Sequence, residues 1–192
     1  MSGSQKPRRT DAELWADLCA LPDHLKGQII DGELIVQSRP RPRHALAIAA
    51  LNTAVGRDTG GPEETGGWWI LIEPGVELPG APEIVPDLAG WRRATLPELD
   101  LDAPLTTRPD WACEVFSPSN TLRVIAKKQQ VYARSGVEWL WHVNPDPLVR
   151  VLQVFRLVDG GQWLLVATCS DEPAVRLPPF EDVEIRLSKL WL

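Results

Sequence analysis

The spacing of hydrophobic residues predicts three helices, separated by segments with the pattern of strands. Through residues 44–57, alanine, leucine and isoleucine recur three and four positions apart, as on the buried face of an amphipathic helix. Thr10 and Glu13 match the capping box that begins a helix, and Gly136 is the kind of residue that ends one. The expected helices are 11–20, 44–57 and a segment from a cap at Ser119 or Asn120 to about Ser135.

Short apolar segments bounded by glycine and proline make up most of the remaining chain, and they predict β-strands. These segments are 68–73, 76–78, 84–91 with an interruption at Pro86, 111–116, 138–143, 149–157, 162–168 and 183–187. Asp31 and Gly32 separate two further apolar runs, which predicts a hairpin because glycine accepts the positive φ of a tight turn. We therefore expect an α/β (α+β) fold, with helices packed on a mostly antiparallel, partly parallel sheet.

Length and composition indicate a globular protein. The chain has 192 residues, of which 44% are hydrophobic and 24% charged, and these ordinary values exclude a disordered or fibrous protein. We expect residues 1–9 to be a disordered basic tail and residues 10–192 to form a single domain. No apolar run approaches the ~20 residues that span a bilayer, and the polar start is unlike a signal peptide. A cytoplasmic protein without a membrane partner is therefore expected.

Charge and cysteine content narrow the function classes further. A net charge of −6 argues against a protein that coats nucleic acid, because phosphate contacts need many Lys and Arg. The same charge is compatible with an enzyme that meets nucleic acid at one metal-bearing cleft. Three widely spaced cysteines exclude a disulfide framework and a CxxC metal clip. The nine scattered tryptophans are expected to be core or interface anchors.

Two carboxylates lie in segments that otherwise have the pattern of buried strands. Asp87 follows the apolar segment 84–86, and Glu114 lies inside the apolar segment 111–116. A buried carboxylate without a partner is costly. Each of these two therefore needs a lysine or arginine, a set of backbone donors, or a cation.

One lysine of the third predicted helix is placed to reach these carboxylates. Lys128 lies four residues before Tyr132 on one helical face, whereas Lys127 lies with Arg123 and Gln130 on a more polar face. A cation held by two carboxylates, with a lysine beside it, suits phosphodiester hydrolysis, because the metal activates water and the lysine stabilises the developing charge. Oxygen ligands favour Mg²⁺ or Mn²⁺. On spacing alone, a purely structural ion pair is the favoured interpretation of the same residues.

A resemblance to a known family favours the nuclease interpretation. The segments IIDGELIV, RPRPRHALA, VPDLAGW, WACEVFSPSN and KKQQVYARSGVEWLWHVNP follow one another with the order and spacing of the Uma-type family of restriction-endonuclease-like proteins. The chain resembles this family from about Gln28 to Pro145. The family is a branch of the PD-(D/E)XK nuclease superfamily. The resemblance therefore implies a restriction-endonuclease-like core with an added N-terminal hairpin, a divalent metal ion, and DNA as the substrate.

The resemblance also implies roles for individual residues. Asp87 matches the aspartate of the PD element and would be the first metal ligand, while Glu114 matches the acidic residue of the second element. The backbone carbonyl of Val115 would be a further ligand. The lysine of the usual second element would stand at Phe116, but this family supplies it from the next helix, here as Lys128.

Three further positions bear on activity. His44 matches a histidine at the start of the family's first core helix and by analogy approaches the phosphate or the activated water, or else it bonds a neighbouring loop. The family usually has Glu where this chain has Gln28. A glutamine can hold a water but brings no charge to a cation. The family also usually has Asp where this chain has Val124, four residues before Lys128. An aspartate there would fix the position of Lys128. These departures favour an alternative, a catalytically weakened or inactive module that binds nucleic acid or protein.

Basic residues and the apolar end of the chain suggest partners. Arg39, Arg41 and Arg43 alternate along a segment expected to be extended, which would place them on one side to contact DNA phosphates; a solvated loop is the other reading. The apolar residues 190–192 and the many tryptophans predict a homodimer, as many endonucleases need two sites to cut two strands. A structural or assembly protein, with the acidic pair as a relic, is a third hypothesis.

Overall fold

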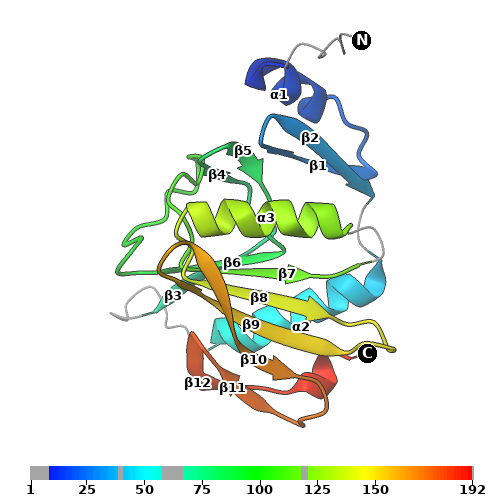
Figure 1. Cartoon of the computed structure of the whole chain (residues 1–192), viewed down its shortest axis with the longest axis vertical. Helices are drawn as coiled ribbons and strands as arrows, with labels where there is room; N and C mark the ends of the chain where they lie inside the picture. Colours follow the sequence, from blue (N-terminus) through cyan, green and yellow to red (C-terminus); the bar gives the residue numbers. More distant parts are fainter. Residues whose placement is uncertain (1–8, 39–40, 58–66, 118–120, 192) are drawn as a thin grey trace.

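The structure is a computed structural model that describes residues 9–38, 41–57, 67–117 and 121–191. It is a mixed α+β fold, as the sequence predicts (Figure 1). Its helices are α1 (Asp11–Cys19), α2 (Pro42–Arg57) and α3 (Leu122–Arg134), with a 3-10 helix η1 (Leu187–Lys189). Its strands are β1 (Leu25–Ile30), β2 (Glu33–Ser38), β3 (Trp68–Ile72), β4 (Val76–Leu78), β5 (Ala81–Ile84), β6 (Leu88–Arg92), β7 (Trp111–Val115), β8 (Trp139–Asn144), β9 (Val151–Val158), β10 (Gln162–Cys169), β11 (Val175–Leu177) and β12 (Phe180–Ile185). No helix within the described ranges is long and apolar enough to cross a membrane.

A six-stranded sheet lies at the centre of the molecule, with strand order β10-β9-β8-β7-β6-β3. β7 and β8 run parallel, and the other neighbouring strands of this sheet run antiparallel. α3 connects β7 to β8, because two adjacent parallel strands need a long crossover connection. The expectation of a mostly antiparallel, partly parallel sheet is confirmed. In Figure 1, α3 lies along one face of this sheet and α2 along the other.

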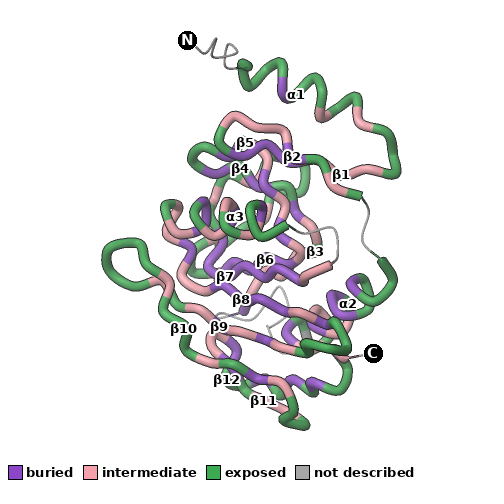
Figure 2. Tube along the Cα trace, turned by 45° about the vertical axis from the view of Figure 1, so that its right-hand side comes forward, coloured by how far each residue is buried: buried purple, intermediate pink, exposed green. Residues whose placement is uncertain are grey.

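Both faces of the sheet are covered, so alternate residues of β7 belong to two different cores (Figure 2). Trp111, Cys113 and Val115 pack in the core that includes α2. Ala112 packs in the core that includes α3. Because successive side chains of a strand point to opposite faces, Glu114 shares the α3 face with Ala112. The strand pattern thus places a carboxylate beneath α3.

Several tryptophans are core anchors, as expected. Trp91, Trp111 and Trp141 are fully buried. The rings of Trp111 and Trp141 each meet Phe180 edge to face, at centroid distances of 5.0 and 5.7 Å. These contacts fasten β12 onto the α2 side of the sheet, which closes that core.

A four-stranded sheet with strand order β2-β1-β5-β4 carries the predicted hairpin. Asp31 and Gly32 join β1 to β2 with φ values of 53° and 70°, the positive values that a tight turn needs. The predicted capping box is also confirmed, since the Thr10 side chain accepts from the N–H of Glu13 and the Glu13 side chain accepts from Thr10.

The expected strand 84–91 is in fact two strands in two different sheets. β5 ends at Ile84 in the four-stranded sheet, and β6 begins at Leu88 in the central sheet. Pro86 lies between them, and it lacks the N–H that a strand ladder requires. The prediction of one interrupted strand was therefore wrong. The break places Asp87 at the junction of the two sheets.

Both long helices begin at residues other than those expected. α2 begins at Pro42, two residues before His44, because proline suits the first position of a helix. α3 follows Thr121, whose side chain accepts a hydrogen bond from the N–H of Val124 at 3.3 Å. Ser119 and Asn120, the expected caps, lie outside the described residues, as does nearly all of the expected basic tail.

Candidate active site

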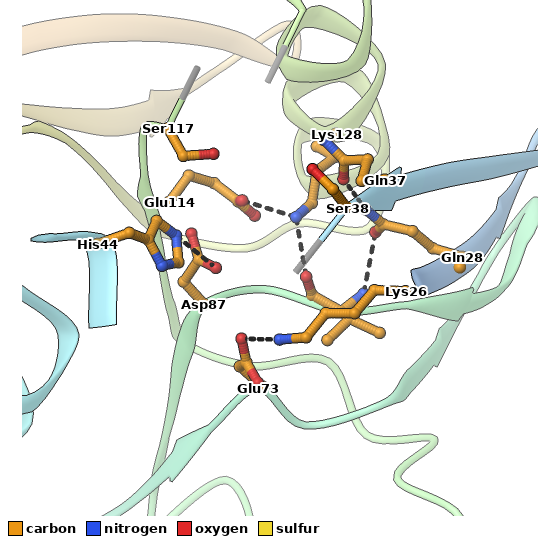
Figure 3. A pocket seen from close by; sticks show the side chains of 12 residues that line it. Lys26, Gln28, Gln37, Ser38, His44, Glu73, Asp87, Glu114, Ser117 and Lys128 are labelled. Carbon is orange, nitrogen blue, oxygen red and sulfur yellow. Dashed lines mark hydrogen bonds and ion pairs between the residues drawn. The ribbon is translucent and has the colours of Figure 1, made fainter. Parts of the chain in front are cut away.

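The five predicted catalytic residues line one pocket. A cavity of about 230 Å³ lies where the β1–β2 hairpin meets β7, α3 and the start of α2. Its lining includes Gln28, His44, Asp87, Glu114 and Lys128. Figure 3 shows His44, Asp87 and Glu114 on one side of this space, with Gln28 on the other. The structure therefore brings together residues from five separate segments of the chain.

Asp87 is held in place by two groups that come from different elements. Its Oδ2 accepts a hydrogen bond from the backbone N–H of Val115 at 2.7 Å, and its Oδ1 lies 3.2 Å from Nε2 of His44. The side chain of Asp87 is 15% exposed, against 4% for that of Glu114. Asp87 is thus the more accessible of the two carboxylates. It is the N–H of Val115 that contacts Asp87; a ligand role for the Val115 carbonyl stays a prediction.

Glu114 accepts one short hydrogen bond at each carboxylate oxygen. Nζ of Lys128 lies 2.6 Å from Oε2, and the hydroxyl of Tyr132 donates to Oε1 at 2.6 Å. Burial raises the pKa of Glu114 to about 7, although Lys128 lowers it. The negative charge of Asp87 adds to the rise. Glu114 is therefore a buried acid whose charge depends on its cationic neighbours.

Tyr132 is a site residue whose role the sequence analysis missed. The residue is fully buried, and burial raises the pKa of its hydroxyl well above its ordinary value, so the hydroxyl stays a donor. By donating to Glu114, it fixes the orientation of that carboxylate. The available signal was its spacing, because Tyr132 lies one helical turn after Lys128 on the same face of α3.

The helical faces predicted for the two lysines are confirmed. Lys128 is 4% exposed, and its Nζ donates both to Glu114 and, at 2.8 Å, to the carbonyl of Val85. Lys127 instead lies 2.5 Å from the carboxylate of Glu33, which also pairs with Arg123 at 2.8 Å. Adjacent lysines thus serve different purposes, one in the pocket and one on the surface.

Gln28 supports the segment that carries Asp87. Its Oε1 accepts from the N–H of Val85 at 3.2 Å, and its Nε2 donates to Gln37 at 3.3 Å. Two residues before it on β1, Lys26 also lines the pocket and pairs with Glu73. This pair was not predicted from the sequence, although residues 26 and 28 share a face of a strand with period two.

The basic segment before His44 was predicted to be extended, but the structure shows that part of it is helical. Arg43 lies in the first turn of α2, and Arg41 directly precedes the helix, so they do not alternate along a strand-like connector. Arg39 lies outside the described residues. Arg41 and Arg43 nevertheless line one cavity together, next to the candidate active site. A contact with phosphate stays a prediction for all three.

The donor set of the pocket fits a divalent cation. Asp87 and Glu114 repel each other, since the charge of Asp87 raises the pKa of Glu114, and a cation between them would remove this repulsion. Carboxylate oxygens are ligands that Mg²⁺ and Mn²⁺ prefer. Within the described part of the chain, no group of three or more His, Cys, Asp and Glu is arranged to hold a metal ion. Two carboxylates would thus need backbone or water oxygens to complete a site.

A buried histidine adjoins Glu114 in the neighbouring strand. His142 of β8 pairs in register with Glu114 of β7, and its ring packs between Phe116 and Phe155 at 5.0 and 5.1 Å. Burial and, to a lesser degree, the charge of Lys128 lower the pKa of His142 to about 4. His142 is therefore neutral at pH 7 in the folded protein.

We expect replacement of His142 by phenylalanine to make folding less sensitive to acid. As the pH falls from about 6.5 towards 4, the unfolded chain binds a proton that the folded chain excludes, so stability is lost in this window. The wild type should lose about 3 kcal/mol more free energy of unfolding between pH 7 and pH 4 than His142→Phe. Urea unfolding at both pH values measures the difference. The exposed His24 provides the control, since His24→Gln should keep the full loss; equal losses in wild type and His142→Phe would refute the assignment.

Comparisons with known proteins agree with the fold. A model of the Uma2 family, described as "Putative restriction endonuclease", matches residues 13–188. Among solved structures, the crystal structure of a "putative nuclease belonging to DUF820" from Anabaena variabilis has a TM-score of 0.64 and 18% identity, over 92% of this chain and 96% of that chain. None of the curated proteins matches significantly. Because the family model covers most of the chain, this protein belongs to the Uma2 family of restriction-endonuclease-like proteins.

Proposed function

We propose that this protein is a divalent-metal-dependent endonuclease that hydrolyses phosphodiester bonds in DNA. The observation that carries the proposal is the pair of the buried Glu114 and the partly buried Asp87, which share one polar pocket with Lys128. Membership of a nuclease-type family supports this use of the pocket.

The residues of the pocket divide the chemistry among themselves. Asp87 and Glu114 would hold Mg²⁺ or Mn²⁺, with the carbonyl of Val115 as a further ligand. When bound, the ion would act as a Lewis acid for the phosphate and lower the pKa of an attacking water. Lys128 places a fixed positive charge beside Glu114, where it orients water or stabilises the negative charge that builds on phosphate oxygens.

His44 and Gln28 act indirectly, by positioning Asp87 and the segment that carries it. His44 is 3.2 Å from Asp87, so it orients this carboxylate towards the pocket. Gln28 bonds the backbone of Val85, two residues before Asp87, and so fixes the segment between the two sheets. Groups that orient ligands in this way commonly contribute strongly to metal affinity.

A cleavage assay tests the proposal directly. Supercoiled plasmid and single-stranded DNA should be cut when Mg²⁺ or Mn²⁺ is titrated in, and not when EDTA is present. The Asp87→Ala variant, purified in the same way as the wild type, should be inactive, which excludes a contaminating nuclease. Cleavage without a divalent ion, or cleavage by Asp87→Ala at the wild-type rate, would contradict the proposal.

The second candidate function is a weakened or inactive nuclease fold that binds nucleic acid or protein. Two observations favour it. Gln28 brings an uncharged amide into the pocket where the family has a carboxylate. Val124 is 9% exposed and packs in the α3 core, so no carboxylate stands one turn before Lys128.

Restoring the family's residues separates the two functions. Gln28→Glu should raise metal-dependent cleavage by about 10-fold, because a carboxylate in the pocket strengthens cation binding. A glutamate can keep the hydrogen bond from Val85, since it also accepts. Val124→Asp should add less, as Val124 does not line the pocket. Cleavage rates of the single and double variants measure this; no cleavage even in the double variant would favour the binding module.

We also propose that the protein forms a homodimer, on different grounds from those the sequence suggested. Leu190 and Trp191 are not left in water, because Leu190 is 2% exposed and Trp191 donates its indole N–H to the carbonyl of Ser170. Leu192 lies outside the described residues. β10 offers better support, as an edge strand of the central sheet with Leu164 and Leu165 half exposed. Light scattering at micromolar concentration should give twice the chain mass. A monomer mass would sink this proposal.

A further inference from the structure

A second cavity, of about 500 Å³, adjoins the candidate active site. The two cavities share His44 and Ser117. In Figure 3, both of these residues lie on the side of the pocket that carries Asp87 and Glu114. A group bound in the second cavity would therefore be a direct neighbour of a group bound between the two carboxylates.

The second cavity combines positive charge with an aromatic ring. Arg41 and Arg43 are exposed and line it at the start of α2. Phe116, at the end of β7, is half-buried and also lines it. Among the described residues, Arg41 makes no ion pair. Cationic side chains beside an aromatic ring are the features on which a single nucleotide is held, through its phosphate and its base.

The turn after β8 adds an acceptor that argues for a base rather than a second phosphate. Asn144 and Asp146 both line the cavity. The Asn144 side chain accepts from the N–H of Asp146 at 3.0 Å, and Asp146 accepts from the N–H of Leu148 at 2.9 Å, so the turn has a fixed shape. A carboxylate beside a phosphate would weaken its binding. On a base edge, the same carboxylate accepts hydrogen bonds from N–H groups.

We infer that this cavity binds one unpaired nucleobase next to the scissile phosphate, so that the protein acts on DNA with unpaired nucleotides. The inference rests on the proposed function. A base inside a duplex is stacked on both sides and paired at its edge, so Phe116 and Asp146 reach it only when it is unpaired. Arg41 and Arg43 then neutralise the phosphate of that nucleotide.

Binding without cleavage tests the inference. Fluorescence anisotropy in EDTA at low salt would compare one labelled oligonucleotide as a single strand, as a paired duplex, and as a duplex with one bulged nucleotide. The wild type should bind the single strand and the bulged duplex about 10-fold more tightly than the paired duplex, the scale of one base stacked on an aromatic ring. Phe116→Leu keeps the apolar volume and should lose most of this preference.

Phe155 offers a matched control. Its ring also contacts His142, at 5.1 Å, but it does not line the cavity, so Phe155→Leu should keep the preference. Arg41→Gln should weaken binding to the single strand and the bulged duplex, and reduce its salt dependence by about one phosphate contact.

Four results would overturn the inference: equal affinity for the three DNAs, no binding to any of them, preference retained in Phe116→Leu, or equal loss in Phe155→Leu. These outcomes are separate from those of the proposed nuclease. A preference that depends on Phe116, without cleavage in Mn²⁺, would uphold the subsite and refute the nuclease. Metal-dependent cleavage without any preference in binding would do the reverse.

Discussion

Replacing Lys128 by methionine should lower the rate of DNA cleavage by about 10²–10³-fold, the usual loss when one charge-stabilising donor is removed. Methionine keeps the packing of the apolar stem of the side chain but removes its positive charge. The ammonium group of Lys128 donates to Glu114 at 2.6 Å, beside the space that a phosphate would enter. Single-turnover cleavage at saturating Mg²⁺ measures the loss.

Removing Lys128 also changes the surroundings of the buried Glu114, and so it affects the stability of the folded protein. Without Lys128, Glu114 keeps only the Tyr132 hydroxyl as a side-chain donor, so the metal-free variant should take up a proton at Glu114 more readily. Rates should therefore be compared at temperatures where circular dichroism shows both proteins folded.

Lys127→Met is the matched control for Lys128→Met. It removes the same charge from the adjacent residue of α3, where the side chain pairs with Glu33 outside the pocket. Cleavage by Lys127→Met should stay close to that of the wild type. Equal losses from the two changes would mean that the charge of Lys128 has no special place in the reaction.

Replacing Asp87 by asparagine should reduce metal-dependent cleavage by at least about 10³-fold, at the upper end of the effects expected for electrostatic groups. Asparagine keeps the volume and an oxygen that can accept from the N–H of Val115, so folding should be preserved. The charge that would bind the cation is lost.

Glu73→Gln is the control for Asp87→Asn, because Glu73 is a carboxylate of the same pocket that pairs with Lys26. Its cleavage rate should remain near that of the wild type. Plasmid nicking over a range of Mg²⁺ concentrations gives both rates. Full activity in Asp87→Asn, or a loss of the same size in Glu73→Gln, would contradict the assigned roles.

The parts of the fold that follow from local pattern could be predicted from the sequence. The hairpin at Asp31-Gly32 follows from the positive φ that glycine allows, and the face of Lys128 follows from helical spacing. The burial of Glu114 follows from its place in an apolar strand covered on both faces. These are properties of short segments, which the residue order alone determines.

Features that depend on contacts between distant segments could not be predicted. Pro86 marks an interruption, but only the three-dimensional structure shows that the chain changes sheets there. The Tyr132 hydroxyl needs a partner, yet spacing does not say that the partner is Glu114. Lys26 and Glu73 meet because β1 and the end of β3 converge on one pocket, which no local pattern encodes.

The central claim is that Asp87 and Glu114 together bind one divalent cation, and calorimetric titration of Mn²⁺ into the metal-free protein tests it most directly. We expect one saturable site per chain in the wild type and in Glu73→Gln. Asp87→Asn and Glu114→Gln should each abolish it. No saturable binding in the wild type, or binding that persists in either Asp87→Asn or Glu114→Gln, would contradict the claim.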